Sequence, residues 1–291
     1  MVTAAALLGT GTNFGAEMRR TSDIAVASGN DLYDNTVKAI RALGGIDKYI
    51  PKNGTVGLLI NAPAWWRNRG SFTHPDVTLA VINECLSAGV KELRYILDPS
   101  GSYWDRTSLS DKYRKEIGQV KPAAWKTVNK KIPGAKALKS VDMNGDIFKC
   151  DVFINLPIIK HHTGTLLTCN LKNLMGANTT PSNRFFHTGS GSKTSYGDVA
   201  FLDQCIAELN SLIKPALCVV DAGEVLTTNG PAGPGQLKKI NKVVAGVNPV
   251  SVDAYCATLL GLKPEQVGMI KKASELKLGN AKLSQLNILK I

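Results

Sequence analysis

Three segments in the first third of the chain alternate between strand-like and helix-like patterns. The apolar run TVGLLIN (55–61) is followed by HPDVTLAVINECLSAGV (74–90), in which apolar residues recur at helical spacing. A second apolar run, ELRYILD (92–98), follows after a short link. Strand, helix and strand joined in this way form a right-handed crossover between parallel strands. The alternation predicts an α/β protein with a mostly parallel open sheet and helices on both faces.

The rest of the chain continues this alternation. We expect further helices over 31–45, around 107–118, over 198–213 and over 248–262, the last capped by Asn248, and further strands over 146–157, 215–222 and 240–247. Residues 177–197 are rich in Gly, Ser, Thr and Asn and predict a long loop. No repeat or linker interrupts the pattern, so we expect a single α/β domain over 23–291.

The N-terminal segment differs in composition from the rest. VTAAALLGTGTNFGA (2–16) is small, apolar and Gly-rich, and resembles the second half of a secretory signal. We therefore expect residues 1–22 to be a residual signal-like or disordered segment, with a frayed tail as the alternative. The expected location is exported and periplasmic, with the cytoplasm as the alternative.

Charge and cysteine content exclude several classes of protein. The net charge is +12, from 35 basic and 23 acidic residues, but the basic residues are spread along the chain. We therefore expect an anionic small molecule as the partner and no specific nucleic acid. The six cysteines form no C-x-x-C pair, which argues against a zinc ribbon or an iron–sulfur cluster. No run approaches the roughly 20 apolar residues of a transmembrane helix.

Polar side chains cluster just after the predicted strands. Lys160, His161 and His162 follow the strand that ends at Pro157, and the other two histidines also fall in predicted loops. Ligands of open α/β sheets bind beyond the carboxyl ends of the strands. The sequence therefore predicts a ligand pocket at this edge. Adjacent residues of a strand point to opposite faces, so we expect only one of the two neighbouring histidines to face the pocket.

Three chemistries remain open for this group. The first is a metal site, with His74, His162, His187 and Cys169 as candidate ligands. The second is an anion pocket formed by Lys160, Lys172, Arg67 and Arg184. The third is a desolvated lysine that acts as a base or covalent anchor. The chain carries no G-x-S-x-G, P-loop or H-E-x-x-H motif that would choose between them.

Four ordered motifs resemble the domain-of-unknown-function family 362, over about residues 23–280. They are DVFINLPIIKHH (151–162), LLTCNLKNLMG (166–176), LIKPALCVVDAGEVLTTNGPAGPG (212–235) and VVAGVNPVSVDAYCATLLGL (243–262). Many members of similar extent are exported through twin-arginine signals, and the resemblance implies the same here, although no Arg-Arg pair precedes 2–16. The resemblance implies no established reaction.

The spacing of His162, Lys172 and His187 is also similar, more distantly, to the lactate racemase N-terminal family. In that family the lysine anchors a nickel pincer nucleotide and the histidines serve metal and acid–base roles. Here LTCNL (167–171) replaces the Gly-rich run before the lysine, so the cofactor is not carried over. The resemblance implies only that these three residues line one pocket.

The resulting hypothesis is an enzyme that acts on a small anionic substrate. We expect His162, Lys172 and His187 to be catalytic, with a histidine moving the proton because its pKa lies near working pH. The expected substrate-binding residues are Lys160, Asn173, Arg184, Asn61, Asp221 and Asn229. The alternative is a protein that binds a metal or cofactor without turnover. The sequence indicates neither the identity of a cofactor nor an oligomeric state.

A separate hypothesis concerns the predicted loop 177–197, which we expect to act as a lid. Arg184, Phe185, Phe186 and His187 are the interactive cluster within it. We expect a lid that closes so that Arg184 and His187 meet the ligand while the two rings exclude water. The alternative is a static loop that the Phe pair anchors to the body of the protein.

Overall fold

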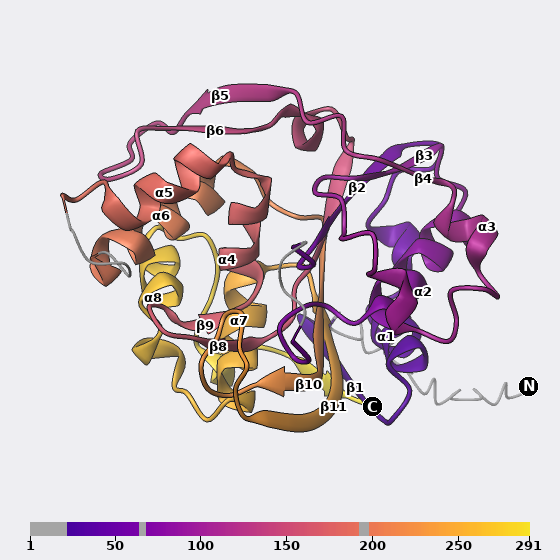
Figure 1. Ribbon diagram of the computed structural model, residues 1–291. Helices are drawn as coiled ribbons and strands as arrows, with labels where there is room; N and C mark the ends of the chain where they lie inside the picture. Colours follow the sequence, from indigo (N-terminus) through magenta and orange to yellow (C-terminus); the bar gives the residue numbers. More distant parts are fainter. Residues whose placement is uncertain (1–21, 64–67, 192–197) are drawn as a thin grey trace, which may run out of the picture.

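A computed structural model describes residues 22–63, 68–191 and 198–291. Its core is an eight-stranded sheet (Figure 1). In spatial order the strands are β12 (Ile288–Lys290), β1 (Ile24–Ser28), β11 (Leu237–Gly246), β10 (Leu217–Leu226), β7 (Val152–Leu156), β2 (Thr55–Ile60), β3 (Glu92–Tyr95) and β4 (Val120–Lys121). Neighbours from β10 to β4 are parallel, whereas β11 is antiparallel to both β1 and β10. The predicted mostly parallel α/β sheet is confirmed.

Helices cover both faces of the sheet (Figure 1). One face carries α1 (Leu32–Ala42) and α2 (Pro75–Ser87), and the other carries α4 (Asn170–Asn173), α6 (Val199–Leu212), α7 (Pro249–Leu259) and α8 (Gly268–Glu275). The side chains of β1 show the division. Ile24 and Val26 pack into the α6–α8 core, whereas Ala25 and Ala27 pack into the α1–α2 core. Alternation along a strand thus separates two apolar layers.

The main helices begin where the sequence places capping side chains. The side chains of Asp31, Asp198 and Asn248 accept hydrogen bonds from the backbone at the starts of α1, α6 and α7. For Asn248, Oδ1 accepts from the N–H of Ser251 at 3.1 Å, as the sequence predicts. The predicted crossover is also present, because β2, α2 and β3 follow one another and the two strands pair in parallel.

Three sequence expectations differ from the structure. The strand expected over 146–157 divides into a 3-10 turn, η3 (Gly145–Phe148), and β7. The helix expected around 107–118 is reduced to α3 (Arg114–Ile117), and η2 (Trp104–Arg106) precedes it. The loop expected over 177–197 begins at the last residue of η4 (Leu174–Ala177) and contains α5 (Thr180–Thr188). Thr179 caps α5 and a proline lies in its first turn, so local capping outweighs a loop-like composition.

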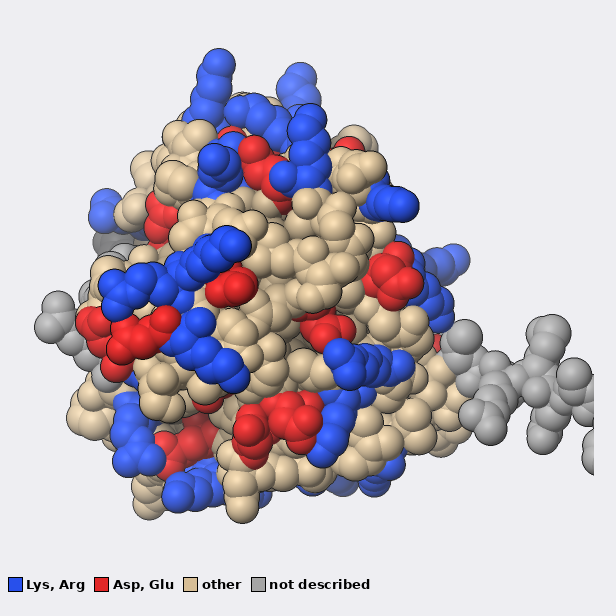
Figure 2. Space-filling view, turned by 90° about the vertical axis from the view of Figure 1, so that its right-hand side faces the viewer, with Lys and Arg blue, Asp and Glu red and all other residues tan. Residues whose placement is uncertain are grey.

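Two small hairpins and three short turns complete the described chain. The hairpins are β5 (Thr127–Lys131) with β6 (Ser140–Asn144), and β8 (Lys160–His162) with β9 (Leu166–Thr168). The turns are η1 (Ile46–Lys48), η5 (Pro264–Gln266) and η6 (Leu283–Gln285). None of the described helices is long and apolar enough to cross a membrane. On the face shown in Figure 2, Lys and Arg are interspersed with Asp and Glu, so no single basic patch covers it.

Candidate functional site

The Lys-His-His group forms one strand of a hairpin at the carboxyl edge of the sheet. After β7 the chain continues beside β10, where the N–H of Ile159 donates to the carbonyl of Asp221 at 3.0 Å. It then pairs with β9, with Lys160 opposite Thr168. Lys160 and His162 are buried and His161 is only partly buried, as strand alternation predicts.

The residues after β9 fold back as the short helix α4. Its first N–H groups are held by the carboxylate of Asp253 on α7, which accepts from Asn170 N at 2.9 Å and from Leu171 N at 3.0 Å. Burial raises the pKa of Asp253 to about 6, and these donors oppose the rise. This anchor fixes the turn of α4 that carries Lys172 and Asn173.

The hairpin, α4 and α5 enclose a cavity of about 460 Å³, which we call the Lys172 cavity. Five residues of the predicted site line it, namely Asn61, His162, Lys172, Asn173 and His187. The other lining residues are Ile60, Pro63, Leu97, Trp125, Thr168, Met175, Gly176, Asn178, Thr180, Asn183 and Pro231. The cavity therefore combines a lysine, two histidines and several side-chain amides with an apolar surface.

His162 is held as a neutral hydrogen-bond donor. Its Nδ1 accepts from the N–H groups of Gly164 at 3.0 Å and Thr165 at 3.2 Å, so the proton of the neutral ring lies on Nε2. Burial, together with the nearby Lys172 and His187, lowers the pKa of His162 to about 2. The expected histidine pKa near working pH is therefore not found for His162, because the ring is desolvated.

Lys172, unlike His162, keeps a pKa close to neutral pH. Burial lowers its pKa, the negative charge of Asp203 on α6 partly offsets the effect, and the result is a pKa of about 8. Its Nζ lies 3.5 Å from the sulfur of Met175, and no described carboxylate is within ion-pair distance. The Lys172 amine can therefore gain or lose a proton near neutral pH, and no described carboxylate serves as its counter-ion.

Behind the cavity, buried amides form a continuous chain of hydrogen bonds. Asn61 Nδ2 donates to Asn173 Oδ1 at 2.7 Å, and Asn173 Nδ2 donates to Asn155 Oδ1 at 2.7 Å. Asn155 Nδ2 continues to the carbonyl of Asn170 at 3.0 Å. Lys160 closes the other end, because its Nζ donates to Asn61 Oδ1 at 3.2 Å. The network fixes the orientation of the amides that reach the cavity.

The family described as "Domain of unknown function (DUF362)" matches residues 56–258, which is most of the chain. The chain belongs to this family. The match confirms the resemblance carried by the four ordered motifs. No curated protein matches the chain.

Two solved structures show a distant likeness to this DUF362 chain. The lactate racemase apoprotein from Thermoanaerobacterium thermosaccharolyticum shares 11% identity at a TM-score of 0.47, covering 87% of this chain and 56% of that one. A protein from Thermotoga maritima shares 14% identity at a TM-score of 0.41, covering 85% and 60%. The chain thus spans less than two thirds of either neighbour. Likeness at this level does not transfer an activity.

Four predicted site residues of the DUF362 chain lie outside the Lys172 cavity. Lys160 is fully buried behind it, with a pKa that burial lowers well below the usual range. Arg184 is exposed on α5, and Asn229 is exposed in the turn after β10, where its Nδ2 donates to the Pro234 carbonyl at 3.2 Å. Asp221 lines a second cavity. The sheet edge therefore does not gather all the predicted polar residues at one place.

The candidate metal ligands are also divided. His74 lines the second cavity, whereas His162 and His187 line the Lys172 cavity. Cys169 is buried in the apolar core. Within the described part of the chain, no three His, Cys, Asp or Glu side chains are grouped so as to hold a metal ion. The four candidates thus do not form one site as placed here, and metal binding stays a prediction.

The helix α5 changes the interpretation of the predicted lid. Phe186 is fully buried in the core, and Phe185 is exposed but contacts the ring of Phe201 with centroids 5.6 Å apart. Arg184 is exposed on the same helix and does not line the cavity, whereas His187 does. The described part of this segment therefore fits the static alternative, and residues 192–197 lie outside the described chain.

Asn178 and Asn183 line the cavity and were missed by the sequence analysis, whereas His187 was predicted. Asn183 and His187 both line the cavity because they are four residues apart on α5, and that spacing brings side chains onto one helix face. The T-x-x-S cap at Thr179 and the proline after it were the signals for this helix. Asn178 donates to Asn183 Oδ1 at 3.2 Å and joins the same group.

Proposed function

We propose that this DUF362 chain is an enzyme that binds a small anionic molecule in the Lys172 cavity. The observation that carries the proposal is Lys172 itself. Its amine lies in a partly apolar cavity, beyond ion-pair distance of every described carboxylate. A buried cation without a counter-ion is stabilised by an anion that enters beside it.

The neighbouring groups suit the same ligand. His162 offers the N–H of Nε2 and keeps it, because a pKa of about 2 leaves the ring neutral at physiological pH. Asn61 and Asn173 are oriented by the buried amide chain. In this proposal these groups bind and orient the ligand, and the proton-transfer role falls to Lys172, whose pKa is about 8. His187 completes the cavity on the α5 side.

The proposal is tested with small anions as probes. The melting temperature of the protein is measured with a panel of small carboxylates and with inorganic phosphate, since a ligand of the native state raises it. Lys172→Met should abolish the shift. Lys271→Met, which removes an exposed lysine from α8, should retain it. Equal shifts in both variants would refute the role of Lys172.

Two further measurements address charge and turnover. Binding should weaken as the pH rises through about 8, because the Lys172 ammonium loses its proton there.

An NMR time course of the protein with each bound probe separates an enzyme from a binding protein. Conversion that Lys172→Met removes supports the enzyme, whereas tight binding of an unconverted ligand supports the alternative without turnover.

Export is a separate part of the proposal. The apolar, Gly-rich segment 2–16 supports it, and this segment lies outside the described residues. Fractionation of cells that produce the full chain tests it. Recovery with periplasmic marker proteins is the expected result, and recovery with cytoplasmic markers would contradict it.

A further inference from the structure

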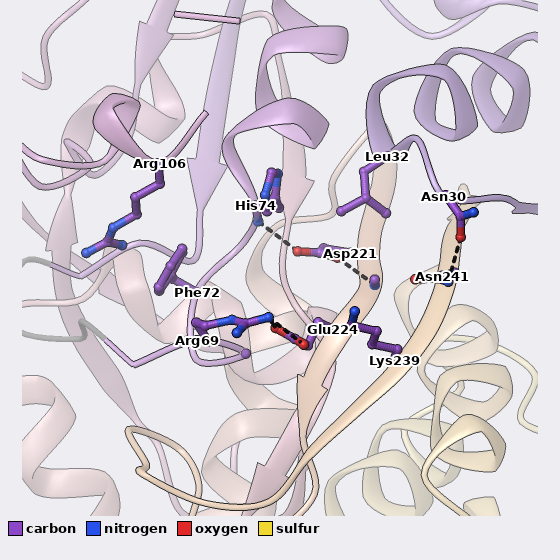
Figure 3. Close-up of a pocket in the computed structure, with 12 residues that line it drawn as sticks. Asn30, Leu32, Arg69, Phe72, His74, Arg106, Asp221, Glu224, Lys239 and Asn241 are labelled. Carbon is purple, nitrogen blue, oxygen red and sulfur yellow. Dashed lines mark hydrogen bonds and ion pairs between the residues drawn. The ribbon is translucent and has the colours of Figure 1, made fainter. Parts of the chain in front are cut away.

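A second cavity, of about 720 Å³, opens on the α1–α2 side of the sheet (Figure 3). We call it the Asp221 cavity. Its lining combines acidic Asp221 and Glu224 with basic Arg69, Arg106 and Lys239. Figure 3 shows Asp221 near the middle of the lining, with Arg69 turned to Glu224, Lys239 beside that pair, and Arg106 farther out beyond Phe72. Charges of both signs therefore meet in one cavity, unlike the lining of the Lys172 cavity.

An irregularity in the sheet brings the two acidic side chains together. Asp221 and Glu224 are three residues apart on β10 and would point to opposite faces of a regular strand. The register shifts between Ala222 and Glu224, which pair with Lys242 and Lys239 on β11. One residue of β10 therefore faces two of β11 in this bulge. Bulges of this kind redirect side chains and are frequent beside binding sites.

Gly223 lies at the bulge and permits the close packing around it. A Cβ at this position would lie 2.7 Å from Cδ1 of Leu32 and 3.2 Å from Oδ1 of Asp221. The absence of a side chain leaves the Asp221 carboxylate at the cavity surface and lets Leu32 form the adjacent apolar part of the lining.

Asp221 is buried, and burial raises the pKa of its carboxyl group, an effect that the nearby His74 opposes. Its Oδ2 accepts from the N–H of His74 at 2.7 Å, and its Oδ1 accepts from the N–H of Gly223 at 2.8 Å. Each carboxylate oxygen can accept a further hydrogen bond. Although only 2% of the residue is exposed, no described Lys, Arg or His side chain lies within ion-pair distance of it. A buried carboxylate of this kind is stabilised by a cationic group of a ligand.

The basic side chains lie toward the solvent. Arg69 is 71% exposed and bonds Glu224 at 2.8 Å, and Lys239 is exposed on β11. Arg106 stacks over the ring of Phe72, with its guanidinium carbon 3.9 Å from the centroid. A ligand whose cationic group reaches Asp221 therefore meets positive charge at its outer end.

We infer that the Asp221 cavity is a second ligand site, which takes a small zwitterion of the amino acid class. The ammonium group of the ligand bonds Asp221, and its carboxylate meets Lys239 and Arg106 at the rim. A simple anion would be repelled by Asp221 and Glu224, and a simple cation would be repelled by the rim. Only a molecule with both charges complements both parts of the lining.

The experiment compares free amino acids with derivatives that lack one charge. Binding of α-amino and ω-amino acids is measured by calorimetry, and the length series reports the separation of the two charges. N-acetylation removes the ammonium group and amidation removes the carboxylate, so each should weaken binding at least tenfold. The inference is overturned if no free amino acid binds, or if the acetylated and amidated forms bind as well as the free one.

Variants assign the binding to this cavity. Asp221→Asn keeps the shape and removes the charge, and should weaken binding at least tenfold. Should this variant fail to fold, Lys239→Met and Arg106→Met test the part of the site that meets the ligand carboxylate. Each should weaken amino acid binding about threefold or more. Unchanged affinity in the variants that fold would refute the site. Lys172→Met should leave amino acid binding unchanged, which separates this inference from the proposed function.

Discussion

The two cavities lie near each other along the chain but on opposite faces of the sheet. Asn61 directly follows β2 and lines the Lys172 cavity, whereas His74, further along the same loop, lines the Asp221 cavity. Lys160 connects them, because its buried Nζ donates both to Asn61 Oδ1 and to the carbonyl of Ser71. One loop after one strand thus contributes to two sites of different chemistry.

The difference between the cavities is the placement of charge. In the Lys172 cavity, desolvation lowers the pKa of two basic groups, Lys172 and His162, and the other polar lining residues are His187, threonines and amides. In the Asp221 cavity, desolvation raises the pKa of a carboxylate. Burial penalises charge of either sign, so the layer that covers a group decides its protonation as much as its residue type does.

The largest expected effect concerns α5, which lines the Lys172 cavity but not the Asp221 cavity. Phe186→Ala should lower the free energy of unfolding by about 4 kcal/mol, because it removes a fully buried aromatic ring. Phe185→Ala, at 40% exposure, is the matched control and should cost less than about 1 kcal/mol. Urea denaturation measures both. A small effect of Phe186→Ala would mean that α5 is a mobile lid after all.

A second variant removes the support of α4. Asp253→Ala should cost about 3 kcal/mol of unfolding free energy, because it leaves buried donors of Asn170 and Leu171 without an acceptor. Anion binding in the Lys172 cavity should weaken in the same variant, whereas amino acid binding in the Asp221 cavity should not. Loss of both anion binding and amino acid binding in a folded variant would show that the two cavities are not independent.

A third variant addresses the Asp221 cavity alone. Gly223→Ala should lower the free energy of unfolding by about 2 kcal/mol, because its Cβ overlaps Leu32. Amino acid binding should fall while anion binding persists. Gly101→Ala, where a Cβ meets nothing within 4 Å, is the control and should be close to neutral in both assays. A neutral Gly223→Ala would contradict the tight packing at the bulge.

The smallest expected effect is a pH dependence from His162. Its pKa is about 2 in the folded protein and 6.5 when unperturbed, so the unfolded chain binds the proton first as the pH falls. Stability is therefore complete above pH 6.5 and falls below it, by about 1 kcal/mol per pH unit. His162→Asn, which keeps an acceptor near the Nδ1 position, should remove this slope between pH 6.5 and 5. An unchanged slope would assign it to other groups.

The sequence by itself determined the features that depend on local pattern. Alternation of strand and helix predicted the parallel sheet, and the cap at Asn248 placed the start of α7. The position of Lys160 and His162 after a buried strand placed these two residues at the carboxyl edge of the sheet, and His162, Lys172 and His187 all line one cavity. Their chemical roles stay predictions. These inferences succeed because side-chain periodicity and chain direction are local properties.

Only the tertiary structure decided which face each polar group meets and how far it is desolvated. The bulge between β10 and β11 directs Asp221 and Glu224 into a separate cavity, although Asp221 follows the same kind of apolar run as Lys160. Packing of α4 and α5 over the hairpin lowers the pKa of His162 and Lys172. Register shifts and burial arise from contacts between segments far apart in the chain, and a local pattern carries no record of them.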